Sequence, residues 1–230
     1  MKEISIMNRI TLLEEKILNV CEHCGRKRNE IKVMAVSKNH GIEEIKEVYN
    51  AGISMFGENR IQEAVKKFEY EELRKNIDLH FIGNLQRNKA KKAVNFFDCI
   101  QTLDRDSLLD ELAVLTSIKE EPLMVLLEFH TGEDTKAGYR SLEDLFWAVE
   151  KLLLCPGLKL EGLMTMAPFT SCKDSQRRSF KALYKAKEEV KKRFLLEMPC
   201  LSMGMTQDFE TAIEEGSTLL RIGSGIFGGD

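Results

Sequence analysis

The fold is decided by residues 32–57, which read KVMAVSKNHGIEEIKEVYNAGISMFG. Residues 33–36 form an apolar run rich in β-branched side chains, which is typical of a strand buried on both faces. Residues 42–51 then repeat apolar side chains at helical spacing, and a second short apolar run follows at 55–57. This order of strand, helix and strand predicts a parallel βαβ unit.

The same unit recurs along the whole chain. Strands are expected at 32–37, 55–57, 79–83, 99–103, 123–129, 159–166, 200–203 and 219–222. Helices are expected at about 5–24 and at 42–51, 61–76, 105–118, 142–154, 173–196 and 209–215. Eight strands that alternate with helices predict an α/β fold, a single (β/α)8 barrel of the TIM type with an extra N-terminal helix.

The domain organisation follows from the absence of any interruption in this series. No Pro/Gly/Ser-rich linker or low-complexity tract divides the sequence, so we expect one domain over residues 1–230. The chain stops seven residues after Gly223, and the opening helix is expected to take the place of a full eighth helix. The alternative is an open doubly wound sheet, which does not need eight similar strands and usually has a glycine-rich first crossover.

Composition excludes several classes of protein. The 230 residues include 34 basic and 37 acidic side chains, so nothing indicates a general nucleic-acid binder. The N-terminus lacks the apolar core of a secretory signal, and no apolar run approaches membrane-spanning length, so we expect a soluble, cytoplasmic protein. Cys21 and Cys24 have metal-like spacing, but no second Cys or His pair follows at zinc-finger distance, and no metal site is expected.

Lys38 is the first candidate for chemistry, because functional groups in such barrels collect at the C-terminal ends of the strands. It follows a nearly apolar strand, where partial desolvation favours the neutral amine. A neutral amine attacks aldehydes, so Lys38 is a candidate nucleophile for Schiff-base formation. The alternative is a lysine that caps the strand and extends into solvent, and the position of Lys38 alone favours that alternative.

Two glycine-containing loops predict a phosphate site. Residues 202–206 (SMGMT) and 223–225 (GSG) directly follow the last two expected strands, where barrel proteins often bind phosphate through backbone N–H groups. The alternative is that these glycines only permit tight turns. Arg221 precedes the second loop, and its guanidinium can donate hydrogen bonds to a phosphate or a ring nitrogen.

Other polar residues at the same end are weaker candidates when they are read alone. His80 fits a buried histidine as well as a ligand contact, and Asn59 fits a turn residue after Gly57. Glu133 and Lys136 belong to a segment interpreted as a loop with solvated charges.

Together these residues resemble the pyridoxal phosphate homeostasis proteins, a family that is similar to the barrel domain of alanine racemase. The resemblance covers nearly the whole chain. Its most specific stretches are 35–38 (AVSK), 56–63 (FGENRIQE), 80–89 (HFIGNLQRNK), 162–168 (GLMTMAP), 201–208 (LSMGMTQD), 216–218 (GST) and 221–228 (RIGSGIFG). The sequence departs from the family pattern at residues 39–41 and 128–130, which puts the shape of the pocket mouth in doubt.

The resemblance implies a fold type III pyridoxal-phosphate protein that carries the cofactor as an internal aldimine on Lys38. It also implies that Arg221 faces the pyridine nitrogen and that Asn59 and His80 lie at the cofactor ring. The residues that it places around the phosphate are Ser202, Gly204, Gly223 and Ser224.

The function implied is that of a carrier that buffers pyridoxal 5′-phosphate or delivers it to apo-enzymes, as a monomer or weak homodimer, without catalysis. An arginine at the ring nitrogen disfavours the pyridinium form and so weakens the cofactor as an electron sink. The alternative is an amino-acid racemase, but related racemases take a tyrosine base from a further C-terminal domain of a partner subunit, before which this chain ends. A third possibility, a barrel enzyme acting on a phosphosugar or nucleotide, leaves Lys38 unmodified.

Overall fold

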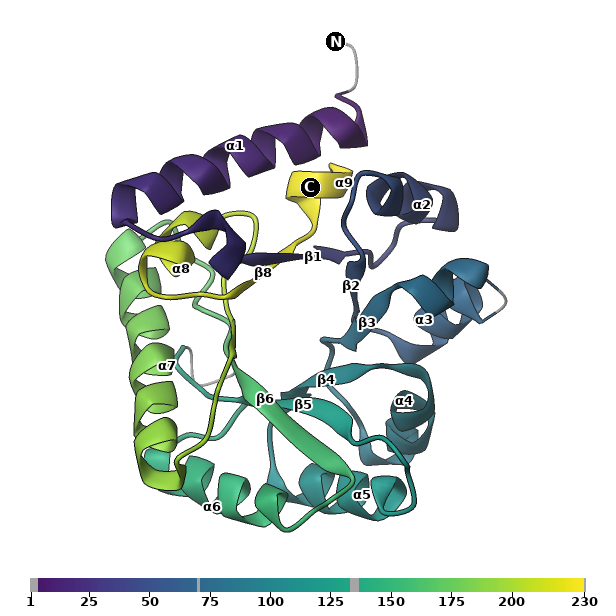
Figure 1. Cartoon of the computed structure of the whole chain (residues 1–230), viewed down its shortest axis with the longest axis vertical. Helices are drawn as coiled ribbons and strands as arrows, with labels where there is room; N and C mark the ends of the chain where they lie inside the picture. The colour runs from purple at the N-terminus through teal and green to yellow at the C-terminus, as the bar shows by residue number, and fades with distance from the viewer. Residues whose placement is uncertain (1–3, 70, 133–136, 230) are drawn as a thin grey trace.

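The computed structural model describes residues 4–69, 71–132 and 137–229 and contains a closed parallel barrel. Its strands pair in chain order, and the last strand closes the barrel on the first (Figure 1). They are β1 (Lys32–Val36), β2 (Met55–Glu58), β3 (Asp78–Phe81), β4 (Cys99–Leu103), β5 (Leu123–Glu128), β6 (Leu158–Met164), β7 (Cys200–Ser202) and β8 (Leu219–Ile222). The predicted closed barrel is confirmed, and the open doubly wound sheet is excluded.

Helices surround this barrel (Figure 1). They are α1 (Ile6–Cys24), α2 (Ile42–Asn50), α3 (Ile61–Phe68), α4 (Ala90–Phe96), α5 (Asp106–Thr116), α6 (Leu142–Leu153), α7 (Lys173–Phe194), α8 (Phe209–Glu214) and α9 (Ser224–Phe227). Because α9 has only four residues, α1 packs against it and against α8 and covers this part of the barrel. The opening helix therefore takes the place predicted for it.

Local sequence signals set the ends of α1. The Ser5 hydroxyl accepts a hydrogen bond from the Asn8 N–H, and Gly25 ends the helix in the left-handed conformation at φ 71°. Ile10, Leu13 and Ile17 recur at helical spacing and are buried. This stripe fixes which face of α1 turns toward the barrel.

Two helical predictions need correction. The helix expected at 61–76 ends at Phe68, and Glu72–Asn76 forms a separate 3₁₀ turn. Glu71 is extended, at φ −93° and ψ 126°, and its N–H donates to the Phe68 carbonyl at 3.2 Å, so the helical hydrogen-bond pattern is broken before residue 72. The helix α4 was not among the predicted helices, although its alanines and lysines are strong helix formers.

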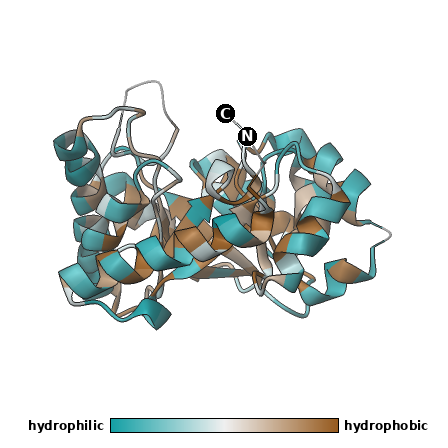
Figure 2. Cartoon of the chain, turned by 90° about the horizontal axis from the view of Figure 1, so that it is seen from above, coloured by the Kyte–Doolittle hydropathy of each residue, from teal (hydrophilic) through white to brown (hydrophobic). Residues whose placement is uncertain are grey.

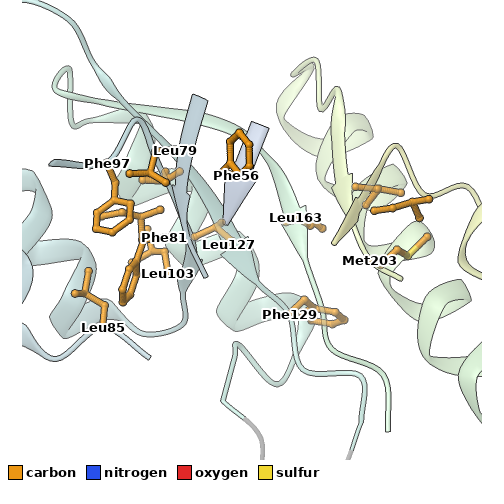
Figure 3. Packing of buried hydrophobic residues seen from close by; sticks show 14 of the residues in the cluster. Phe56, Leu79, Phe81, Leu85, Phe97, Leu103, Leu127, Phe129, Leu163 and Met203 are labelled. Carbon is orange, nitrogen blue, oxygen red and sulfur yellow. The ribbon is translucent and has the colours of Figure 1, made fainter. Parts of the chain in front are cut away.

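The main apolar core lies between the strands and the helices. Figure 3 shows Phe56, Leu79, Phe81 and Leu103 packed in this layer, and Figure 2 shows hydrophobic positions gathered around the strands with hydrophilic positions on the outer helix surfaces. Alternate strand residues point into the barrel instead. There, two small apolar clusters are separate from the main core: Met34, Val36 and Leu219 form one, and Cys99, Leu126 and Met164 form the other.

Within the described ranges, no helix is long and apolar enough to cross a membrane. All six cysteines are free thiols.

Candidate functional site

A cavity of about 610 Å³ opens at the C-terminal ends of the strands. Its lining comes from the segments that follow β1, β2, β3, β6, β7 and β8, which is where a (β/α)8 barrel places its functional groups. Five of the predicted residues line it: Lys38, Asn59, Arg221, Gly223 and Ser224. His80, Ser202 and Gly204 do not line it.

Lys38 lies in the turn directly after β1. The strand ends at Val36 and the following Ser37 is fully buried, so Lys38 lies beyond the barrel rim and is exposed. The partial desolvation expected from the apolar strand is therefore wrong for this structure. The next residue, Asn39, is in the left-handed region at φ 66°, a conformation that few residues other than glycine and asparagine adopt readily.

Asn59 and Gly83 form adjacent parts of the cavity wall. A Cβ atom at Gly83 would lie 2.1 Å from the backbone oxygen of Asn59. Only glycine therefore allows the loop after β3 to approach the loop after β2 this closely. Thr102 fixes the same loop from the other side by donating its hydroxyl to the Gly83 carbonyl at 2.6 Å.

Arg221 enters the cavity from the barrel interior and is buried. Its guanidinium donates to the Ser202 hydroxyl and to the Thr165 carbonyl, at 2.8 Å each. Burial lowers the pKa of Arg221, while the charges of Asp208 and Glu128 oppose that shift. The Arg221 guanidinium is thus held in one orientation beneath the cavity. Its N–H groups can donate hydrogen bonds but cannot accept them.

A continuous hydrogen-bond chain, Arg221–Ser202–Gln101–His80, extends from this arginine through the barrel. Because Arg221 can only donate, the Ser202 oxygen accepts from it, and the Ser202 hydroxyl donates to Gln101 Oε1 at 2.6 Å. The Gln101 amide nitrogen then lies 2.7 Å from His80 Nδ1. This order assigns the unprotonated nitrogen of a neutral imidazole to Nδ1 and its N–H to Nε2.

The chain ends at Asp78. His80 Nε2 lies 2.9 Å from Asp78 Oδ1, which is ion-pair distance, but neither atom has an aligned hydrogen-bond partner. Both His80 and Ser202 therefore lie one layer below the cavity wall, and their contacts in this structure are with the barrel interior. Gln101, at the centre of the chain, was not among the predicted site residues.

Gly204 has a packing reason to be glycine. Its φ is 95°, and a Cβ atom there would lie 2.6 Å from the Cβ of Ala212 on α8. Its carbonyl also accepts the backbone N–H of Arg221 at 2.9 Å. Gly204 thus lets the loop after β7 pass closely over α8, and the cavity wall is formed by the next residues, 205–208.

Asp208 is a site residue that the sequence analysis did not single out, although it lies in one of the quoted stretches. It lines the cavity, is buried, and accepts the Met205 N–H at 2.6 Å. Burial raises its pKa, and the hydrogen bond and the charge of Arg221 oppose that shift. Among the described residues, no backbone acceptor receives the N–H groups of Thr206, Gln207 and Ser224.

The wall beside Lys38 contains one aromatic contact that the sequence did not indicate. His40 lines the cavity and stacks on Phe227, with ring centroids 4.3 Å apart and an interplanar angle of 15°. Residues 133–136, whose charges were assigned to a loop, lie outside the described residues.

Comparison with known proteins places this geometry in a family. The model of the alanine racemase N-terminal domain matches residues 11–230. A pyridoxal phosphate homeostasis protein of Aquifex aeolicus is 40% identical over 228 residues, and the match covers 96% of each chain. The protein of the same name from Escherichia coli is 35% identical and covers 97% of this chain and 96% of its own.

Solved structures agree with this result. PipY of Synechococcus elongatus, determined with pyridoxal phosphate bound, is 30% identical and covers 93% of this chain and 100% of its own, with a TM-score of 0.80. Alanine racemase of Bacillus anthracis has a TM-score of 0.70 but only 15% identity, and the match covers 97% of this chain and 56% of the racemase. The second likeness shows the shared fold alone.

Proposed function

The chain belongs to the family of pyridoxal phosphate homeostasis proteins, and we propose that it holds pyridoxal 5′-phosphate covalently on Lys38 and acts as a carrier without catalysis. Its role is cofactor homeostasis. The observation that carries the proposal is the sharing of one cavity by an exposed lysine amine, a buried arginine and a group of unpaired backbone N–H groups.

The residues of the cavity fit the cofactor in their chemistry. The unpaired N–H groups of Thr206, Gln207 and Ser224 are suitable donors for a phosphate dianion. Gly223 leaves room beside them, because a Cβ atom there would meet nothing closer than 3.7 Å. Of the predicted phosphate contacts, Gly223 and Ser224 lie at the cavity, whereas Ser202 and Gly204 are assigned here to supporting the wall.

Lys38 provides the point of attachment. Bound pyridoxal phosphate supplies an aldehyde carbon. The Lys38 amine would form a C=N bond to this carbon, with the aldehyde oxygen and both amine protons leaving as water. An exposed amine at the cavity mouth also suits a reversible attachment, which a protein that delivers its cofactor requires.

Arg221 favours carrying over catalysis. With the cofactor bound, the Arg221 guanidinium would donate to the ring nitrogen and has no proton to give up, so it would keep this nitrogen unprotonated and the ring a weak electron sink. A racemase also needs a second base. Among the described tyrosines none lines the cavity, and Tyr139 donates its hydroxyl to Asp106 at 3.2 Å and is buried.

The first test is a visible absorption spectrum of the protein with pyridoxal phosphate, followed by borohydride reduction and peptide mapping. We expect a yellow species whose reduced adduct maps to Lys38 and is lost in Lys38→Ala. A reduced adduct on another lysine would refute the assignment of Lys38. Amino-acid racemisation above the Lys38→Ala background would refute the non-catalytic role.

Delivery has its own test. When the loaded protein is mixed with a pyridoxal-phosphate-dependent apo-enzyme, activity should appear faster than the cofactor dissociates into a scavenger. Sedimentation of the loaded protein alone measures its oligomeric state, which is proposed to be a monomer or a weak homodimer.

A further inference from the structure

We infer that Lys67 of α3 is a positioning residue for Lys38, acting through an ionic clamp formed by Lys67, Glu58 and Glu63. This inference rests on the proposed attachment of the cofactor to Lys38. None of the three clamp residues lines the cavity. Their effect on attachment is transmitted through the backbone on both sides of Lys38.

The clamp is centred on the Lys67 ammonium. Its nitrogen lies 2.9 Å from Glu58 Oε1 and 2.7 Å from Glu63 Oε1, and its side chain is only 11% exposed. Glu58, the last residue of β2, is fully buried, and its Oε1 also accepts the Ser37 hydroxyl at 2.7 Å. One buried cation thus joins the end of β2, the first turns of α3 and the residue before Lys38.

The clamp also holds the backbone on either side of Lys38. Lys67 donates to the carbonyl of Ser37 at 2.7 Å, and Glu63 accepts the backbone N–H of Asn39 at 2.6 Å. The two peptide groups that flank Lys38 are therefore fixed to the same ion-paired centre. The Glu63 contact also stabilises Asn39 in its left-handed conformation at φ 66°.

This arrangement compensates for the exposure of Lys38. A buried side chain is oriented by its neighbours, but the exposed Lys38 is not packed in this way, so the direction of its side chain depends on its own backbone. Covalent attachment requires the amine at a fixed distance and angle from the aldehyde carbon. A loop that samples several backbone conformations would present the amine correctly for only part of the time.

The test separates positioning from binding by using two ligands. Pyridoxal phosphate measures attachment, followed by absorbance in stopped flow and by borohydride trapping at Lys38. The analogue 4′-deoxypyridoxine 5′-phosphate has a methyl group in place of the aldehyde, so it measures occupancy of the cavity without any covalent bond. The variants are Lys67→Met, the double variant Glu58→Gln/Lys67→Met, which removes both buried charges, and Lys66→Met as an exposed control on the same helix.

We expect attachment to slow by about 10- to 100-fold in both Lys67 variants, because a small displacement of a reacting group has effects of this size. Affinity for the methyl analogue should change by less than about twofold, and Lys66→Met should match the wild type in both measurements. If the clamp only stabilised the fold, its loss would change the rate of attachment and the affinity for the methyl analogue to a similar extent. The double variant keeps the test valid if Lys67→Met does not fold.

Two results would overturn the inference in distinguishable ways. Normal attachment rates in folded Lys67 variants would refute the positioning role and leave the proposed function intact. Failure of the wild type itself to attach pyridoxal phosphate at Lys38, while the methyl analogue still binds, would refute covalent carriage and the positioning role with it.

Discussion

The two sides of the cavity fix their nitrogen groups by opposite means. On the β1 side, the turn that carries Lys38 is held by the ionic clamp, in which one lysine contacts two carboxylates. On the β8 side, Arg221 is held by the hydrogen-bond chain, whose intermediate members Ser202 and Gln101 are neutral. The first nitrogen is exposed and the second is buried.

The difference follows from what each nitrogen has to do. Lys38 must remain accessible to form a bond, so it is not itself packed, and only the backbone around it is fixed. Arg221 has only to keep its direction, so it is buried and two of its N–H groups are held by neutral acceptors. A network of charges depends strongly on every member, because removing one leaves another charge buried without a partner. A neutral chain distributes the loss over several weaker bonds.

The largest effect on stability is therefore expected at the ionic clamp. Lys67→Met leaves the buried Glu58 without its cation, which should lower the free energy of unfolding by about 3 to 5 kcal/mol. Glu58→Gln/Lys67→Met removes both charges and should recover most of that loss. Urea unfolding of the two variants measures the difference. Equal losses of unfolding free energy in the two variants would show that Lys67 does not compensate the buried charge of Glu58.

The sequence was sufficient to predict the fold and the location of the cavity. Both follow from patterns that extend over whole elements: the alternation of apolar strands with amphipathic helices, and the rule that barrel sites lie at the C-terminal strand ends. Gly223 was a candidate because it directly follows a strand and leaves backbone N–H groups accessible. The strand position of Lys38 alone favoured a lysine in solvent, and its role at the site was implied by the family resemblance.

The supporting contacts were not predicted, because they join residues distant in sequence and have no local signal. Gln101 contacts His80 and Ser202 across the barrel, and nothing in the sequence around it distinguishes it from another polar strand residue. Lys67 looks like one more lysine on an exposed helix face. Only the closure of the barrel and the seating of α3 bring these side chains to their partners.

A smaller effect is expected from cutting the hydrogen-bond chain. Gln101→Leu has nearly the same volume but leaves the Ser202 hydroxyl proton without an acceptor and His80 Nδ1 without a donor, so it should cost about 2 kcal/mol. Gln176→Leu is the matched control, since this buried glutamine donates one bond, to the Thr170 carbonyl. If urea unfolding gives the control an equal or larger loss, the chain does not stabilise the barrel interior.

The smallest effects are expected in the pH dependence of stability. The comparison is between Glu58 of the ionic clamp and Asp78 at the end of the hydrogen-bond chain. Burial raises the pKa of Glu58 above its ordinary value of 4.5, against the opposing contacts with Lys67 and Ser37. The folded protein then binds the proton before the unfolded chain does, so the contribution of Glu58 to stability increases as the pH falls through the raised pKa and levels off below 4.5.

Asp78 should behave in the opposite way. Burial acts to raise its pKa, but the contact with His80 and the charges of Lys32 and Arg74 together outweigh burial and hold the pKa below the ordinary value of 3.8. Its contribution is therefore present above 3.8 and is lost as the pH falls through the lowered folded-state pKa. Urea unfolding of the wild type, Glu58→Gln and Asp78→Asn from about pH 7 to about pH 3 gives two difference curves. With falling pH the Glu58 curve should rise and then level off, whereas the Asp78 curve should stay level and then fall. Curves that run in the same direction would show that the ionic clamp and the far end of the hydrogen-bond chain do not differ in the way that their charges imply.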